Sequence, residues 1–113
     1  MKERIIINLS EIVGSPNCIS AEHGQRVYEN IATLMLVGNR ILLNFDQVEI
    51  VTPTFLNASV GQLYDKFSSH RIRELVSVQG LATDDLVLLK RIVDNAKRYF
   101  QNGQGCSQTN NDF

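Results

Sequence analysis

Cysteine is scarce in this chain of 113 residues, which contains only Cys18 and Cys106. Neither residue belongs to a CxxC or CxxH pair. Two unpaired cysteines do not form the disulfide framework that stabilises many small secreted proteins. The sequence therefore favours a reducing compartment, and we expect a cytoplasmic protein.

An excess of charge of one sign is also absent. Eleven lysine and arginine residues oppose twelve aspartate and glutamate residues, which gives a formal net charge of -1. The longest basic clusters are Arg71-Ile72-Arg73 and Lys90-Arg91. A protein that binds nucleic acid usually carries a basic face and a positive total charge. We therefore expect no nucleic-acid partner.

Long hydrophobic runs are missing as well. The apolar run Ile5-Ile6-Ile7 is too short for the core of a signal peptide, and no segment approaches the roughly 20 apolar residues that span a bilayer. The sequence thus predicts no association with a membrane. A chain of this length has room for one hydrophobic core, so it predicts a single domain.

The familiar catalytic and cofactor motifs GxGxxG, GxxxxGK[ST] and GxSxG do not occur. His23 and His70 have no second metal ligand at the usual spacing, and we interpret both as structural or surface residues. Asp84 and Asp85 are interpreted as the charged first turn of a helix, and Cys18 as a bystander. The sequence therefore predicts no enzyme, no metal and no cofactor.

Strand and helix patterns alternate along the chain. Apolar runs predict strands at residues 4–9, 40–45, 48–51 and 75–79, with a loop at 10–19. Helical periodicity predicts three helices: from a Ser20 cap to Gly38, from Thr52 to Phe67, and from a Thr83 cap to Phe100. This order is typical of an α/β domain with a mostly parallel or mixed sheet of three to four strands covered by about three helices. The domain spans residues 1–101, and the polar residues 102–113 are predicted to be a disordered tail.

Two details of the helices carry further expectations. Gly24 lies in the first helix and is expected to weaken it by up to about 1 kcal/mol relative to alanine. Phe100 falls on the apolar stripe of the last helix, together with Leu89 and Val93, and is expected to be buried.

Thr52-Pro53-Thr54 is the candidate functional site. Thr52 is a suitable N-cap for the helix that follows, and proline is favoured at the first helical position. Thr54 then has no capping role. A phosphate on its hydroxyl would lie beside free backbone N–H groups at the positive end of the helix. Thr54 is therefore a candidate phosphoacceptor.

The residues from Ile41 to Phe67 resemble a known family. Asn44-Phe45-Asp46 joined to Thr52-Pro53-Thr54-Phe55-Leu56 is similar to the STAS-like group of bacterial proteins (DUF4325-type), an offshoot of the anti-sigma-factor antagonist (STAS) fold. In antagonists the motif is Asp-Ser-Ser-Gly-Leu, and a histidine-kinase-like ATPase phosphorylates the second serine. Matching the shared leucine to Leu56 places the phosphoacceptor on Thr54, whereas Thr52, Pro53 and Phe55 depart from the motif.

The resemblance implies a non-catalytic regulatory module that docks on a histidine-kinase-like ATPase or a similar protein partner and is switched by phosphorylation of Thr54. The implied docking residues are Thr52, Pro53, Thr54, Phe55 and Leu56, with a partly exposed Phe55 as an apolar anchor. The alternative is a domain that senses a small ligand or nucleotide in a crevice at the carboxyl ends of the strands. There Gly80 and Thr83 would face Thr52 and Thr54.

Overall fold

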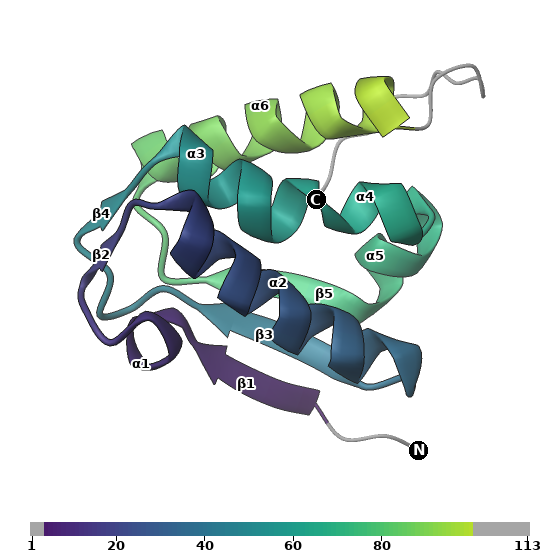
Figure 1. Ribbon diagram of the computed structural model, residues 1–113, viewed down its shortest axis with the longest axis horizontal. Coiled ribbons are helices and arrows are strands. Elements are labelled where there is room, and N and C mark those ends of the chain that lie inside the picture. The colour runs from purple at the N-terminus through teal and green to yellow at the C-terminus, as the bar shows by residue number, and fades with distance from the viewer. Residues whose placement is uncertain (1–3, 101–113) are drawn as a thin grey trace.

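A parallel three-stranded sheet forms the centre of the computed structural model, which describes residues 4–100 (Figure 1). The strands β1 (Arg4–Asn8), β3 (Arg40–Asn44) and β5 (Val76–Gln79) lie in the order β1-β3-β5. Both neighbouring pairs are parallel. The predicted α/β class and the three main strands are thus confirmed.

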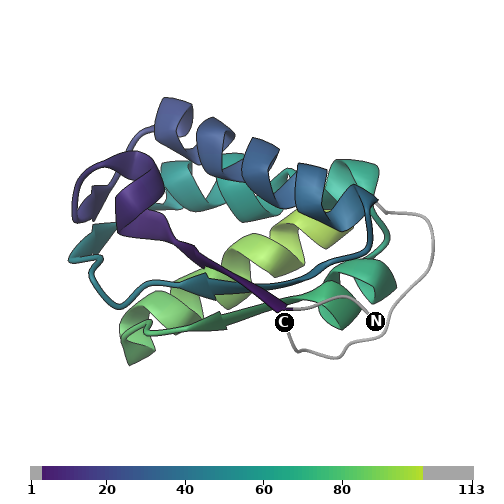
Figure 2. The same cartoon turned by 90° about the horizontal axis from the view of Figure 1, so that it is seen from below.

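The two faces of this sheet differ in composition. Ile41 of β3 pairs with Ile5 of β1 and Val76 of β5, and Leu43 pairs with Ile7 and Val78. Ile7, Ile41, Leu43 and Val76 belong to the hydrophobic core, and Val78 packs against it. Figure 2 shows the helix α2 in the layer beside this sheet. On the opposite face Arg4, Arg40, Ile6 and Ser77 are exposed, while Leu42 of the central strand is buried.

The fourth predicted strand does not join the main sheet. Only Ile50–Val51 is extended there (β4), and it pairs in parallel with β2 (Asn17–Cys18) to form a separate two-stranded sheet. The Glu49 amide donates to the carbonyl oxygen of Pro16 at 2.7 Å, and the Thr52 amide donates to that of Cys18 at 3.2 Å. The predicted strand at residues 48–51 is therefore shorter than expected and belongs to a second sheet. Its pairing joins residues about thirty positions apart, so no local pattern could predict it.

The predicted loop at residues 10–19 also contains a short helix, α1 (Leu9–Val13), that precedes β2. Leu9 and Val13 are one helical turn apart and both are buried. Gly14 ends the helix in the left-handed conformation, with φ +81°. Five residues are too few to show a helical period in the sequence, and the loop prediction missed this helix.

The first long helix, α2 (Ala21–Leu36), begins as predicted. The Ser20 hydroxyl accepts a hydrogen bond from the His23 amide at 3.1 Å, which confirms the N-cap. Gly38 follows the helix with φ +84°, a conformation that favours glycine, so the predicted stop is also confirmed.

Gly24 has a packing role that its low helix propensity concealed. A Cβ at this position would lie 2.7 Å from the Ala58 Cβ and 2.7 Å from the carbonyl oxygen of Phe55. The missing side chain therefore lets α2 approach the neighbouring helical segment closely. That segment consists of α3 (Pro53–Leu56), a π-helical turn η1 (Asn57–Gly61) and α4 (Leu63–Lys66).

The helix predicted from Thr52 to Phe67 is present but is widened at η1. The buried Ser59 hydroxyl donates to the carbonyl oxygen of Phe55 at 2.8 Å, which gives a polar side chain in the core a partner. Val60, Leu63 and Tyr64 are buried, as the helical period predicted.

Two helices complete the described chain: α5 (Ser69–Leu75) and α6 (Thr83–Phe100). The helix α5 was not predicted, because its seven residues bury only Ile72 and Leu75. The helix α6 starts at Thr83 itself, because the Leu86 amide already donates to the carbonyl oxygen of Ala82. Thr83 is therefore the first helical residue rather than the cap that was predicted.

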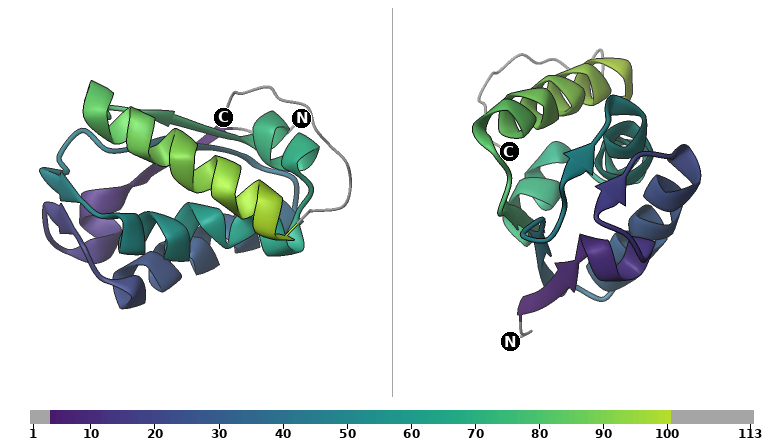
Figure 3. Two further views of the ribbon diagram at one scale, coloured as in Figure 1. Left: turned by 90° about the horizontal axis from the view of Figure 1, so that it is seen from above. Right: turned by 90° about the vertical axis from the view of Figure 1, so that its left-hand side faces the viewer.

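The stripe of α6 that faces the core contains Leu89, Ile92, Val93 and Ala96. Figure 3 shows α6 lying alongside the segment α3–η1–α4. Phe100 is 39% exposed, which corrects the prediction that it is buried, because it borders an open pocket instead of packing into the core. No helix within residues 4–100 is long and apolar enough to cross a membrane. The predicted tail at 102–113, with Cys106, lies outside the described residues.

Candidate functional site

The predicted site lies at one end of the molecule, where several elements meet. The carboxyl ends of the main strands, the small β2–β4 sheet and the beginnings of α3 and α6 all lie on the left of Figure 1. The right-hand view of Figure 3 looks at this end directly. Parallel α/β folds gather functional residues at such an edge.

Thr52 has a structural role at this end. Its hydroxyl accepts a hydrogen bond from the Phe55 amide at 3.2 Å, which confirms the predicted N-cap. The same hydroxyl donates to the carbonyl oxygen of Ile19 at 2.6 Å. Because the hydroxyl both donates and accepts within the fold, Thr52 is not a suitable phosphoacceptor. Pro53 follows at the first helical position, as predicted, and is exposed.

Thr54 differs from Thr52 in each of these respects. It is exposed, and its hydroxyl makes no hydrogen bond within the described residues. An acceptor hydroxyl must reach the active site of a kinase, so exposure is a requirement for phosphorylation. The structure meets this requirement at Thr54 without any movement of the core.

Phe55 and Leu56 are both fully buried, at 0% exposure. The expectation of a partly exposed Phe55 was therefore wrong. The helix directs both side chains into the main hydrophobic cluster, whereas Pro53 and Thr54 face solvent. Neither buried residue can contact a partner unless the core opens, but the bulk of Phe55 does not obstruct access to Thr54.

Two exposed isoleucines that the sequence prediction missed lie beside Thr52. Ile19 is 46% exposed and directly follows β2, and Ile50 is 49% exposed and lies in β4. The register Asn17 to Ile50 and Cys18 to Val51, with the alternation of side chains along strands, places Ile19 and Ile50 on the same face of the small sheet. We call Ile19, Ile50, Pro53 and Thr54 the β2–β4 surface.

Nothing in the sequence around Ile19 predicts its exposure. The alternation of residues 48–51 indicates the opposite, because it places Val48 and Ile50 together on the face away from Glu49. In the structure Val48 packs against the core, whereas Ile50 is exposed. Single exposed hydrophobic residues are common, but two on one face beside an exposed hydroxyl form a small apolar patch of the kind used for protein contacts.

At one border of the region predicted to hold a small ligand, the turn after β5 lies close against the end of β3. Gly80 has φ +87°, and a Cβ there would lie 2.5 Å from the Asp46 Oδ1 and 2.7 Å from the Asp46 amide nitrogen. The side chains at the strand ends bond to one another: Asn44 Nδ2 donates to Asn8 Oδ1 at 2.8 Å, and Gln79 Nε2 donates to Asn44 Oδ1 at 3.3 Å. The close approach of Gly80 to Asp46 leaves no space for a ligand between these two residues.

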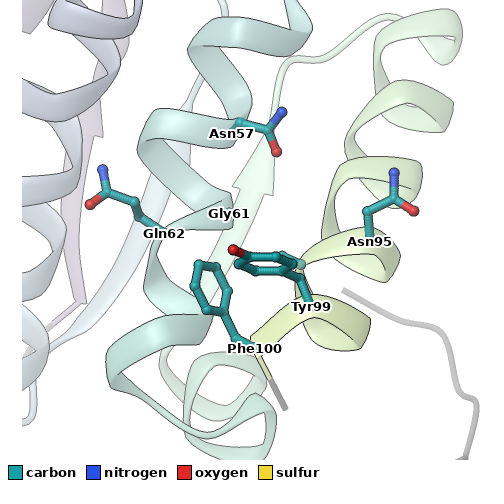
Figure 4. Close-up of a pocket in the computed structure, with 7 residues that line it drawn as sticks. Asn57, Gly61, Gln62, Asn95, Tyr99 and Phe100 are labelled. Carbon is teal, nitrogen blue, oxygen red and sulfur yellow. The ribbon is translucent and has the colours of Figure 1, made fainter. Parts of the chain in front are cut away.

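A pocket of about 370 Å³ opens instead between η1 and the last turns of α6 (Figure 4). Tyr99, 79% exposed, and Phe100 stand at its border with their rings edge to face, 4.8 Å between centroids. Asn57, Gly61, Gln62, Asn95 and Ala96 complete the lining. The seven residues that line the pocket include no charged side chain. The pocket lies at the opposite end of α6 from Thr83, away from the predicted crevice.

Residues 4–100 contain one cysteine and two histidines, the residue types most often found as nucleophile, base or metal ligand. Cys18 is fully buried, and burial raises the pKa of its thiol to about 11, so the thiol stays protonated and unreactive at neutral pH. His23 is half-buried, and its Nδ1 atom is buried without a partner among residues 4–100, while His70 is exposed. Within the same residues no three metal-binding side chains lie together.

Fold and site together define a small α/β domain that presents an exposed threonine and two isoleucines at the carboxyl edge of its strands. A family model described as a STAS-like domain of unknown function (DUF4325) matches residues 23–86, which is more than half of the chain. The chain therefore belongs to this family, and the resemblance seen in the sequence is confirmed. Comparisons with curated proteins and with solved structures give no match.

Proposed function

We propose that this domain is a non-catalytic regulatory module that binds a protein partner through the β2–β4 surface. The observation that carries the proposal is the combination of an exposed Thr54 with the exposed Ile19 and Ile50 in a member of the STAS-like family. The likeness of the family to anti-sigma-factor antagonists suggests a histidine-kinase-like ATPase as the partner class.

The geometry supports a modest interface. Ile19 and Ile50 each leave about half of their surface in water, and burying such side chains against a partner gains roughly 25 cal/mol per Å². Thr52 and the β2–β4 pairing hold the two isoleucines in place, so binding costs little ordering of the backbone. The surface can therefore act as a preformed docking site.

Phosphorylation of Thr54 would switch this interface. A phosphate adds about two negative charges at pH 7, next to the apolar patch and at the start of a helix. The charge would weaken contact with an apolar or acidic partner surface, because the phosphate would have to lose water on binding. A kinase would modify Thr54 and not the neighbouring Thr52, because the Thr52 hydroxyl is already hydrogen-bonded to the Ile19 carbonyl and the Phe55 amide.

The test uses the whole chain and each histidine-kinase-like ATPase of its source organism. Calorimetry measures binding of the wild type, of Ile50→Asp and of Thr54→Glu. We expect each substitution to weaken binding by at least about tenfold, since each places a charge in the interface. Thr83→Glu is the matched control, because Thr83 is also an exposed threonine in the first turn of a helix, and it should bind like the wild type.

Mass spectrometry after incubation with the ATPase and ATP tests the switch separately. Phosphate is expected on Thr54 and not on Thr83. Binding without phosphate on Thr54 would remove the switch and leave the docking role. Equal binding by the wild type and Ile50→Asp would contradict the docking surface itself.

A further inference from the structure

The strand β1 is an open edge of the main sheet. It pairs with β3 along all five of its residues, and within the described chain nothing pairs with its other side. Figure 1 shows β1 at the lower border of the sheet, with β3 and then β5 above it. The outward backbone N–H and C=O groups of β1 are therefore available to another strand.

The edge lacks the devices that usually prevent pairing between proteins. Natural edge strands are interrupted by proline, by bulges or by inward-pointing charge. In contrast, β1 reads Arg-Ile-Ile-Ile-Asn, has an unbroken register with β3 and carries its only charge at the first residue. Ile6, at the centre of the strand, is 54% exposed. The other edge, β5, exposes the polar residues Ser77 and Gln79 instead.

The sequence of β1 is complementary to itself when two copies run antiparallel. A two-fold axis at Ile6 places Ile6 opposite Ile6 of the second copy, Ile5 opposite its Ile7, and Arg4 opposite its Asn8. No like charges meet in this register, which would otherwise be destabilising. Ile5, which is only half-buried, and the exposed Ile6 both gain an apolar neighbour.

The polar ends of the strand also match. Asn8 Oδ1 accepts one hydrogen bond, from Asn44 Nδ2 at 2.8 Å, and an amide oxygen has two lone pairs. Its second lone pair can accept from the Arg4 guanidinium of the other copy. The Arg4 side chain makes no hydrogen bond or ion pair with residues 4–100, and it stands in register beside Arg40. The contact with Asn8 would therefore give this cation, which lies beside a like charge, a neutral acceptor.

From this complementarity we infer that the partner of the β1 edge is a second copy of the same chain, joined in an antiparallel β1–β1 pair that makes one continuous six-stranded sheet. A two-fold dimer requires such a self-complementary patch. The inference is independent of the proposed function, because the β2–β4 surface lies at a different place, at the carboxyl end of the strands (Figure 1).

The test is sedimentation of the full chain over a range of concentrations. The wild type should form a dimer that dissociates on dilution. Ile6→Lys and Ile6→Glu should each raise the dissociation constant at least about 100-fold, because each places like charges across the two-fold axis. Mixing the two variants should restore a heterodimer, since the charges then attract. Ile50→Lys is the matched control, because Ile50 is a similarly exposed strand isoleucine, and it should dimerise like the wild type.

Hydrogen exchange of the wild type gives a second measurement that needs no variant. The amides of β1 that point away from β3 should gain protection as the concentration rises, while those of β5 should not change. A wild type that stays monomeric up to its solubility limit would overturn the inference. A dimer that Ile6→Lys leaves intact, or whose amides in β1 gain no protection, would overturn it equally.

Discussion

The Thr52 hydroxyl donates a hydrogen bond of 2.6 Å to the carbonyl oxygen of Ile19, and this bond joins β2 to the start of α3. The hydroxyl oxygen of Thr52 also caps the helix, because it accepts a hydrogen bond from the Phe55 amide. One side chain thus fixes the helix start and the strand that carries Ile19. The order of the β2–β4 surface depends on this residue.

Thr52→Val keeps the shape of the side chain but removes both hydrogen bonds. We expect a loss of about 1–2 kcal/mol in the free energy of unfolding, because an N-cap and the hydrogen bond to the Ile19 carbonyl are lost together. Urea denaturation measures the change. Thr52→Ser should retain most of the stability, and Thr83→Val, at an exposed position, should stay within about 0.5 kcal/mol of the wild type. Equal losses for Thr52→Val and Thr83→Val would show that the Ile19 contact contributes nothing.

Gly24→Ala should destabilise the protein even though alanine is the better helix former. The added Cβ would lie 2.7 Å from both the Ala58 Cβ and the carbonyl oxygen of Phe55, so α2 must move away from the segment α3–η1. Overpacking of this kind costs about 1–3 kcal/mol, more than the gain in propensity of up to about 1 kcal/mol.

Gly61→Ala is the matched comparison for that substitution. A Cβ at Gly61 has its nearest contact, at 3.2 Å, with the side-chain oxygen of the exposed Asn57, which can rotate away. Thermal unfolding should therefore show a clearly larger drop in the melting temperature for Gly24→Ala than for Gly61→Ala. A rise in the melting temperature of Gly24→Ala would mean that the two helices are not in tight contact.

Burial of Cys18 should make stability fall at alkaline pH. The pKa of its thiol is raised from 9.0 to about 11 in the folded protein, because burial disfavours the thiolate. Below about pH 9 both states keep the proton and the stability is unaffected. Between about pH 9 and 11 the unfolded chain loses the proton first, so the free energy of unfolding declines by about 2–3 kcal/mol.

Urea denaturation of the wild type and of Cys18→Ala across this pH range measures the effect. The variant is expected to be less stable at neutral pH, because it leaves a small cavity. Its deficit relative to the wild type should shrink as the pH rises. A deficit that is constant with pH would show that the Cys18 thiol ionises with the same pKa in both states.

Local signals predicted much of the fold. The caps at Ser20 and Thr52 and the helix stop at Gly38 act within a few residues of the chain, so these features followed from the sequence. The three parallel strands followed from their apolar runs. The short α1 and α5 did not, because each buries only two side chains and shows no clear period.

The site was predicted in part, for the same reason. The positions of Thr52 and Pro53 at the helix start are local, and the exposure of Thr54 agrees with the prediction of an accessible acceptor. The burial of Phe55 was not predictable from neighbouring residues. It depends on the close approach of α2, which Gly24 permits, and Gly24 is more than thirty residues from Phe55 in the sequence. Ile19 and Ile50 came together only through the β2–β4 pairing.

The sequence by itself determined the α/β class, the order of the main strands and helices and the family, because these depend on periodicity, caps and a short motif. The tertiary structure decided which residues a partner can reach. Exposure is a property of the whole packed chain: Phe55 turns inward against α2, while Ile19 and Ile50 turn outward on a two-stranded sheet that only distant hydrogen bonds create.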